Sequence, residues 1–340
     1  MTYTFQNTEI NNEKASVFET KSLLYLIGKR ADSKEIEYVT FDCFNDVSGV
    51  NKRHNKIWDI QSKNEKSLSP KKIGSYFYTL FDNYISAFSF KEFIFFSPIL
   101  NDNYKINKSV NIYSIDNIEI KTKERILNGL NEEVKRVKGT VKDYTSEIAA
   151  FLNLVIIVED NETENEYVKA ITKFKKTELK SDEFYHSVFI DLRNIQSAKK
   201  NSYIENKTIN EIREVLSFRR HLSVKDIELL IVSRIIGCEI FKYLAIPLYF
   251  SPFIEGINVE DKKDILEDCN ANLSRAFFNK NSNKVFWKIC EDILAFFSVN
   301  NSKDVESVYK SISSGYVVKI SYLNEITIKY LISIILEGLE

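Results

Sequence analysis

The sequence predicts an α/β protein, with strands and helices in the first part of the chain and a mostly helical region after them. Up to about residue 205, short alternating or continuous apolar runs, typical of strands, are separated by amphipathic patterns of helical period. From about residue 206, successive segments carry apolar residues at helical spacing on one or more faces. This change predicts two domains, 1–205 and 206–340, and a chain of 340 residues is long enough for two domains of ordinary size.

The elements follow from local patterns. A helix is expected over 12–29, where apolar residues recur at helical spacing. Residues 36–63 predict two strands joined by a polar connection of about ten residues. Ser69 followed by Pro70 is a helix-start signal, so a helix is expected over 69–87. Further elements are predicted as strands over 91–97, 151–160 and 183–192 and a helix over 121–139.

The last apolar segment, 331–336, has two interpretations that the sequence leaves open. Five of its six residues are Leu or Ile. Such a segment is either a helix that closes the core or an interface with another subunit.

Composition describes an ordinary globular protein without a strong charge field. Apolar residues make up 44% and charged residues 28%, and 47 Lys and Arg nearly balance 48 Asp and Glu. Any DNA contact must therefore be local or assisted by partners. The four cysteines have no paired spacing, which indicates neither a zinc site nor a disulfide framework. No apolar run approaches the ~20 residues of a membrane span and residues 1–14 lack signal-peptide character, so a cytoplasmic protein with no membrane partner is expected.

The residues that carry chemistry lie in the predicted strand pair. Asp46 follows the first strand, and period two places Asp59, Gln61 and Lys63 on one face of the second. An acid facing a polar-x-Lys pair can form a metal-dependent hydrolytic centre, in which Asp46 and the carbonyl oxygen of Ser62 hold the cation and Lys63 orients or activates water. A solvated strand edge would have the same pattern.

A basic stretch accompanies this candidate centre. Between residues 51 and 75 there are seven cations and two acids, a net charge of +5. A phosphate-facing rim is one interpretation and a solvated loop is the other. The candidate DNA contacts are Lys52, Arg53, His54, Lys56, Lys66, Lys71 and Lys72.

These residues resemble the PD-(D/E)xK nuclease superfamily. A helix, two strands bearing an acid and then x-Lys, a helix and a strand follow one another in its core order. The segments 45–47 (Asn-Asp-Val) and 60–63 (Ile-Gln-Ser-Lys) resemble its Q-x-K branch, the double-stranded-DNA endonuclease domain of bacterial anti-phage effectors. That branch occurs in SAVED-linked CBASS effectors and in nuclease subunits of Lamassu-type systems. The resemblance covers residues 1–100.

The resemblance implies a restriction-endonuclease-like mixed sheet flanked by helices and an enzyme that cuts double-stranded DNA with Mg²⁺ or Mn²⁺. It implies that Asp46 is the principal metal ligand, that Glu19 in the preceding helix is a second ligand, and that Gln61 positions metal or water. Lys63 would offset charge at the phosphorus. Two further acids are expected behind these groups, Asp42 and Asp59. SMC-like or sensor subunits of a defence complex, or self-assembly, would hold such an effector inactive until it is triggered.

Two departures from the family pattern favour an alternative. Asn45 stands where a second acid is common, and Gln61 replaces the carboxylate of the standard motif. The alternative is a catalytically weak or inactive nuclease-fold subunit that serves as a DNA-binding or protein-interaction module. A third interpretation is an unrelated α/β scaffold in which the D-x-Q-x-K pattern is fortuitous.

Overall fold

The computed structural model describes residues 2–5, 13–176, 179–200, 202–242, 245–300, 303–313 and 320–339. The chain divides into two compact units. The sheet unit comprises Met1–Tyr167 and Phe189–Val224, and the helical unit comprises Val168–Val188 and Lys225–Glu340. An α/β fold followed by a mostly helical C-terminal region is therefore confirmed. The units do not divide at residue 206, because 206–224 belong to the sheet unit and 168–188 to the helical unit.

The sheet unit is built on a mixed seven-stranded sheet with the strand order β6-β7-β5-β4-β3-β2-β9. Strands β4, β5 and β7 run parallel, whereas β6, β3, β2 and β9 pair antiparallel with their neighbours. The strand bounds are β2 Ile36–Phe41, β3 Val47–Asn51, β4 Ile57–Ser62, β5 Glu92–Pro98, β6 Ile112–Ser114, β7 Val155–Asp160 and β9 His221–Ser223. A separate two-stranded sheet pairs β1 (Tyr3–Thr4) with β8 (Thr208–Ile209).

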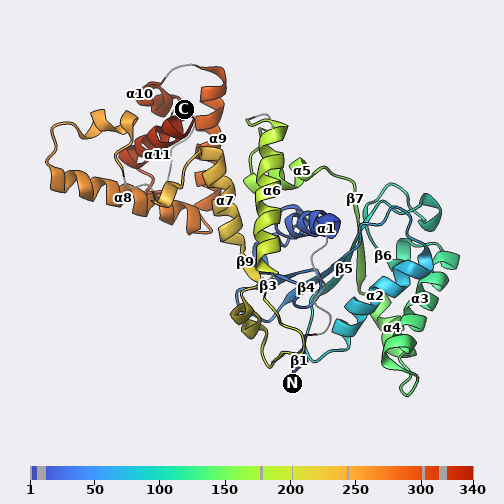
Figure 1. Ribbon diagram of the computed structural model, residues 1–340. Helices are drawn as coiled ribbons and strands as arrows, with labels where there is room; N and C mark the ends of the chain where they lie inside the picture. The colour runs from blue at the N-terminus through green and yellow to red at the C-terminus, as the bar shows by residue number, and fades with distance from the viewer. Residues whose placement is uncertain are drawn as a thin grey trace. The chain divides into compact units, whose positions relative to one another are not determined.

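Helices cover both faces of the sheet, as expected for parallel strands. Helix α1 (Glu13–Leu24), continued by a π-helical turn Tyr25–Lys29, packs Phe18 against Phe96 of β5 with ring centres 5.0 Å apart. Helix α2 (Pro70–Tyr84) packs Phe77 against Phe95, with ring centres 5.2 Å apart. Since adjacent strand residues point to opposite faces, α1 and α2 lie on opposite sides of the sheet (Figure 1).

The helix α2 begins where the sequence predicts. The Ser69 hydroxyl accepts a hydrogen bond from the backbone N–H of Lys72, and Pro70 occupies the first helical position. The remaining helices of this part of the chain are α3 Ile120–Lys138, α4 Thr145–Leu152, α5 Glu164–Thr172 and α6 Asp182–Lys199.

One strand was missed by the sequence analysis. The expected ten-residue polar connection contains β3, so three antiparallel strands stand where two were predicted. Ser48, Gly49 and Asn51 make this segment look like a turn, yet all five strand residues are buried. A side chain at Gly49 would meet Leu26 Cδ2 at 3.0 Å, so a small residue is required beneath the first helix.

The predicted strand over 183–192 is wrong, because these residues lie in α6. Tyr185, Val188, Phe189 and Leu192 are the buried residues, and their spacing of three, four and seven is helical. The alternation of polar and apolar residues around His186 imitated a strand over a short window.

The helical unit has its own core, built around the last helix. Residues 327–336 of α11 are all buried, so the segment left open in the sequence closes a core within this chain. Its helices are α7 Val224–Ile236, α8 Val259–Phe278, α9 Asn283–Val299, α10 Val305–Ser313 and α11 Glu325–Gly338. Within the described ranges, no helix is both long and apolar enough to cross a membrane.

Candidate functional site

The hairpin between β2 and β3 places two acids side by side. Phe41 and Val47 form the last register pair, so the loop starts at Asp42 and ends at Asp46. The Asp42 N–H donates to the Asp46 carbonyl oxygen at 3.3 Å. Asp42 adopts a left-handed backbone conformation with φ of 48°, which is uncommon for a residue with a side chain and is found at functional sites. Asp46 therefore lies in the loop after β2, directly before the first residue of β3.

Asp46 is bound to the end of β4, the strand that carries the Q-x-K residues. Its Oδ2 atom accepts hydrogen bonds from the Gln61 side-chain amide at 2.9 Å, the Ser62 N–H at 2.7 Å and the Ser62 hydroxyl at 2.8 Å. The side chains of Gln61 and Ser62 point to opposite faces of the sheet, and both donate hydrogen bonds to Asp46. The Asp46 carboxylate therefore lies at the end of β4, within reach of side chains from either face.

The Gln61 amide is occupied at both of its ends. Its nitrogen donates to Asp46, and its oxygen accepts from the Thr79 hydroxyl of α2 at 2.7 Å. The side chain is 3% exposed. Gln61 therefore fixes the orientation of Asp46 and does not present a free oxygen to a cation.

Glu19 reaches the same place from α1. Lys200, one residue beyond the end of α6, donates to Glu19 Oε2, and its ammonium lies 3.2 Å from Asp42 Oδ2. Gln196 of α6 lies 3.5 Å from the same Glu19 oxygen and accepts a hydrogen bond from Thr20 at 2.7 Å. We call Glu19, Asp42, Asp46 and Lys200 the acidic site.

Burial and nearby negative charge raise the pKa of two carboxyl groups of the acidic site, Glu19 and Asp42. Burial raises the pKa of Glu19 to about 7, and the negative charge of Asp46 adds to this rise while Lys200 opposes it. Burial likewise raises the pKa of Asp42 to about 6, against the opposing charge of Lys200. The Lys200 and Arg220 cations therefore compensate the negative charge only in part.

Asp59 lies on the α2 face of the sheet in a separate network. Its carboxylate accepts hydrogen bonds from Asn45 at 2.5 Å, Ser48 at 2.9 Å and Asn83 at 2.7 Å. The side chain is fully buried, and burial raises its pKa to about 7. Asp59 thus connects Asn45 of the β2–β3 hairpin to Asn83 of α2 through buried hydrogen bonds.

Lys63 shares the face of Gln61 and Asp59. Its N–H donates to the Phe96 carbonyl at 3.0 Å, which continues the β4–β5 ladder by one residue. The ammonium lies 5.2 Å from the centre of the Tyr76 ring of α2, a cation–π distance. Lys63 thus approaches the end of β4 from the side of the sheet that α2 covers. Glu19, Asp42 and Lys200 lie together on the opposite side, which α1 covers.

The basic stretch is divided between the two ends of β4. Lys52, Arg53, His54 and Lys56 lie in the β3–β4 turn at the start of β4, whereas Gln61 and Ser62 end that strand. The five residues from Lys56 to Gln61 span roughly 16 Å at 3.3 Å per residue. These four residues therefore do not lie beside the acidic site, because the unexpected strand β3 carries the turn to the far end. Lys66, Lys71 and Lys72 do follow the near end of β4.

Several of these cations already have acidic partners. Lys56 pairs with Glu35 at 2.5 Å and Lys71 with Glu132 at 2.6 Å, and Lys72 pairs with Glu65. Lys52, Arg53 and Lys66 are exposed. The His54 ring stacks on Tyr38 with ring centres 5.7 Å apart.

The chain matches no protein-family model, no curated protein and no solved structure. Its chemistry therefore follows from its own side chains.

The acidic site has two carboxylate oxygens, Asp46 Oδ1 and Glu19 Oε1, that could bind a divalent cation. In the described part of the chain, neither Asp46 Oδ1 nor Glu19 Oε1 accepts a hydrogen bond. Among the described residues, no three His, Cys, Asp or Glu side chains are arranged to hold one ion together. Mg²⁺ is commonly bound by one or two carboxylates, with waters and substrate phosphates as its other ligands, so two carboxylates are sufficient.

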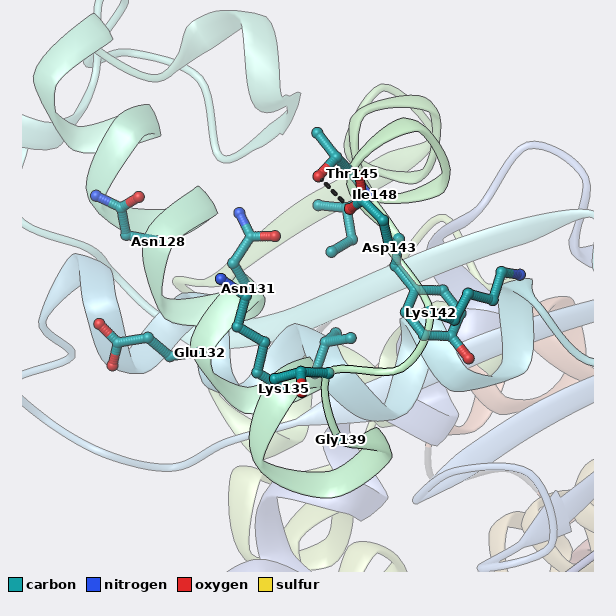
Figure 2. Close-up of a pocket in the computed structure, with 12 residues that line it drawn as sticks. Asn128, Asn131, Glu132, Lys135, Gly139, Lys142, Asp143, Thr145 and Ile148 are labelled. Atoms are coloured by element: carbon teal, nitrogen blue, oxygen red, sulfur yellow. Dashed lines mark hydrogen bonds between the residues drawn. The ribbon is translucent and has the colours of Figure 1, made fainter.

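A cavity of about 570 Å³ lies elsewhere in the sheet unit, between the end of α3, the loop after it and the start of α4. Figure 2 shows Asn131 and Lys135 of α3 across from Lys142 and Asp143. Its charged groups make local pairs, Lys142 with Glu147 at 2.9 Å and Asp143 with Thr145 at 2.6 Å. None of the residues of the acidic site lines it.

The groups that come from distant segments were not predicted from the sequence. Lys200, Gln196 and Arg220 approach Glu19 and Asp42, and Thr79 and Asn83 of α2 hold Gln61 and Asp59. No local pattern marks Lys200, which is 181 residues from Glu19. Thr79 and Asn83 are four residues apart on one helix face, a polar pair within an apolar stripe that could have indicated a buried network.

Proposed function

We propose that this protein is a metal-dependent double-stranded DNA endonuclease. The observation that carries the proposal is the binding of Asp46 to the end of β4, because it joins the acid of the hairpin to the Q-x-K strand. Glu19 of α1 lies in the same group of charges through Lys200. An acid from a hairpin, a second acid from the preceding helix and a lysine at the strand end are the parts that such a nuclease requires.

Each side chain has a distinct role in the proposed reaction. Asp46 and Glu19 would hold Mg²⁺ or Mn²⁺, and the carbonyl oxygen of Ser62 is a further candidate ligand. When bound, the cation polarises the phosphodiester and lowers the pKa of a coordinated water. Gln61 and the Ser62 N–H hold the Asp46 carboxylate in one orientation. Lys63 offsets negative charge that develops on the phosphate.

The biological setting of the proposal rests on the family resemblance. It implies a cytoplasmic effector of an anti-phage system, kept inactive until partner subunits trigger it. The near balance of 47 basic and 48 acidic residues supports such control, since a protein without a basic field depends on partners to bring it to DNA.

Cleavage of supercoiled plasmid with Mg²⁺, Mn²⁺ or EDTA tests the proposal. We expect Asp46→Asn and Lys63→Met to lower the rate at least 100-fold with an unchanged circular dichroism spectrum. Asp46→Asn removes a negative charge that would hold the cation, and Lys63→Met removes the positive charge that offsets charge on the phosphate. Lys263→Met, which removes an exposed lysine of α8, is the matched control and should cut like the wild type. Full cleavage by both site variants, or a wild type that neither cuts nor binds Mn²⁺, would contradict the proposal.

A second candidate is a non-catalytic subunit that keeps the nuclease fold. The binding of the Lys200 ammonium by Glu19 and Asp42 favours it, since a permanent internal counter-ion would leave no need for a metal. Calorimetry with Mn²⁺ separates the two functions, because a non-catalytic site of this kind should take up no cation.

A further inference from the structure

Lys200 occupies an unusual position for a lysine. Its side chain is 8% exposed, and its ammonium is shared between Glu19 and Asp42, which are 7% and 8% exposed. The charge of Asp46 also acts on both acids. One ammonium therefore lies among three carboxylates that come from α1 and the β2–β3 hairpin.

This arrangement differs from an ordinary buried ion pair. A buried ammonium usually has one carboxylate partner and further neutral hydrogen-bond partners, because every extra buried charge costs solvation. Here Arg220 is the second cation, and its Nη1 atom lies 3.7 Å from Asp42. Three carboxylates against two cations leave room for additional positive charge.

A divalent cation would compete for the same place. Oxygen atoms of carboxylates are the preferred ligands of Mg²⁺ and Mn²⁺. An ammonium and a divalent ion repel one another strongly in a buried site, so both cannot contact the same Glu19 carboxylate at full strength. Lys200 therefore stabilises the carboxylates when no metal is bound, and the same ammonium opposes the binding of a metal ion.

We propose that Lys200 is an internal cation that closes the acidic site, and that a divalent cation binds only when the Lys200 ammonium leaves Glu19. This inference rests on the proposed function, because it assumes that Glu19 and Asp46 are metal ligands. It assigns to Lys200 the conditional behaviour for which the family resemblance invokes partner subunits.

The surroundings of Lys200 allow its side chain to move without its backbone. Arg220 donates to the carbonyl oxygen of Lys200 at 2.7 Å and to that of Ser202 at 2.7 Å, which fixes the chain there. The lysine stem has four rotatable carbons and can withdraw the ammonium while the backbone stays in place. Lys200 also follows α6, the helix within which the chain passes from the helical unit back to the sheet unit.

Mn²⁺ affinity of the full chain, measured by calorimetry at pH 8, tests the proposal. We expect Lys200→Met to bind Mn²⁺ at least tenfold more tightly than the wild type, and Lys200→Arg to bind no more tightly. Lys199→Met, the same change one residue earlier at the end of α6, is the matched control and should bind like the wild type. Circular dichroism before each titration identifies any variant that has not folded.

The outcomes separate the two proposals. Equal or weaker binding by folded Lys200→Met, with clear binding by the wild type, would overturn the role of Lys200 and leave the metal site intact. Binding by none of the four proteins would overturn both the internal cation and the metal-dependent nuclease.

Amine labelling of the wild type gives a second measurement that does not depend on a variant. A buried ammonium bound to carboxylates reacts slowly with an acylating reagent, whereas a released one reacts faster. We expect saturating Mn²⁺ to raise acylation of Lys200 at least threefold by mass spectrometry, with Lys199 unchanged. Protection of Lys200 that is the same with and without Mn²⁺ would show that the ammonium stays in place.

Discussion

Single hydrogen bonds decide what each residue of the acidic site can do. The three donors on Asp46 converge on one oxygen, which leaves the other free for a cation. Gln61 is neutral, and its amide nitrogen donates to Asp46 where a carboxylate in its place would repel it. The neutral side chain thus stabilises the orientation of Asp46.

Asp59 predicts a pH dependence of stability. Its folded-state pKa of about 7 lies above the unfolded value of about 3.9, so the folded protein binds the proton more tightly. The contribution to stability is complete below about pH 4 and is lost as the pH rises through about 7. At ~1.4 kcal/mol per pKa unit, the loss is at most about 4 kcal/mol.

Urea denaturation of the wild type and Asp59→Asn between pH 5 and pH 8 measures this effect. We expect the free energy of unfolding of the wild type, minus that of the variant, to fall between pH 5 and about pH 7 and to level off above it. Other titrating groups are common to both proteins and cancel in the difference, as does any constant cost of the asparagine. A difference that does not change with pH would contradict a raised pKa for Asp59.

At the scale of elements, close contacts between backbones position the helices that carry the site. Where α2 and α3 cross, each helix has a glycine that faces the backbone of the other helix. A Cβ at Gly74 would lie 2.0 Å from the Ile126 carbonyl oxygen, and one at Gly129 would lie 2.0 Å from the Lys71 carbonyl oxygen. This close crossing helps to position α2 on the sheet. There the Thr79 hydroxyl donates a hydrogen bond to Gln61, and the Asn83 amide donates one to Asp59.

Gly129→Ala should therefore destabilise the sheet unit. Overpacking against backbone costs typically 1–3 kcal/mol, which outweighs the ~1 kcal/mol that alanine gains over glycine in a helix. We expect a net loss of about 1 kcal/mol in the free energy of unfolding, measured with urea. Asn128→Ala, an exposed neighbour on α3, is the control and should not destabilise the protein.

At the scale of the whole molecule, each unit has an apolar core and one tryptophan. Trp58 of β4 is fully buried in the sheet unit, and Trp287 of α9 is 1% exposed in the helical unit. The sequence contains two tryptophans, so the fluorescence of single-tryptophan variants reports on each unit in turn.

Removing core volume from α11 should affect the unfolding transitions reported by Trp58 and Trp287 differently. Ile332 is fully buried, and truncation of a buried isoleucine to alanine costs about 2–5 kcal/mol. With Trp58→Phe, we expect Ile332→Ala to move the unfolding transition of Trp287 to lower urea. With Trp287→Phe, the transition of Trp58 should stay in place, because Ile332 belongs to the other core. Equal shifts of both reporters would show that the units unfold as one.

The elements whose signals are local could be predicted from the sequence. The start of α2 at Ser69 and Pro70, the strands β4 and β5 and the helical C-terminal region all depend on residues within a few turns or strand positions of one another. The approach of Asp46 to Gln61 and Ser62 also lies within reach, since only 15 and 16 residues separate them.

The remaining features depend on contacts between segments that are distant in the chain. The strand β3 could not be predicted because the burial of Ser48 and Gly49 depends on a helix that covers them. Helix α6 was not predicted because polar and apolar residues alternate over a short window of its sequence. The distribution of the basic stretch between the two ends of β4 follows from that strand. Lys200 joins Glu19 across 181 residues, and a contact between such distant segments leaves no periodic trace in the sequence because chain folding alone brings the two together.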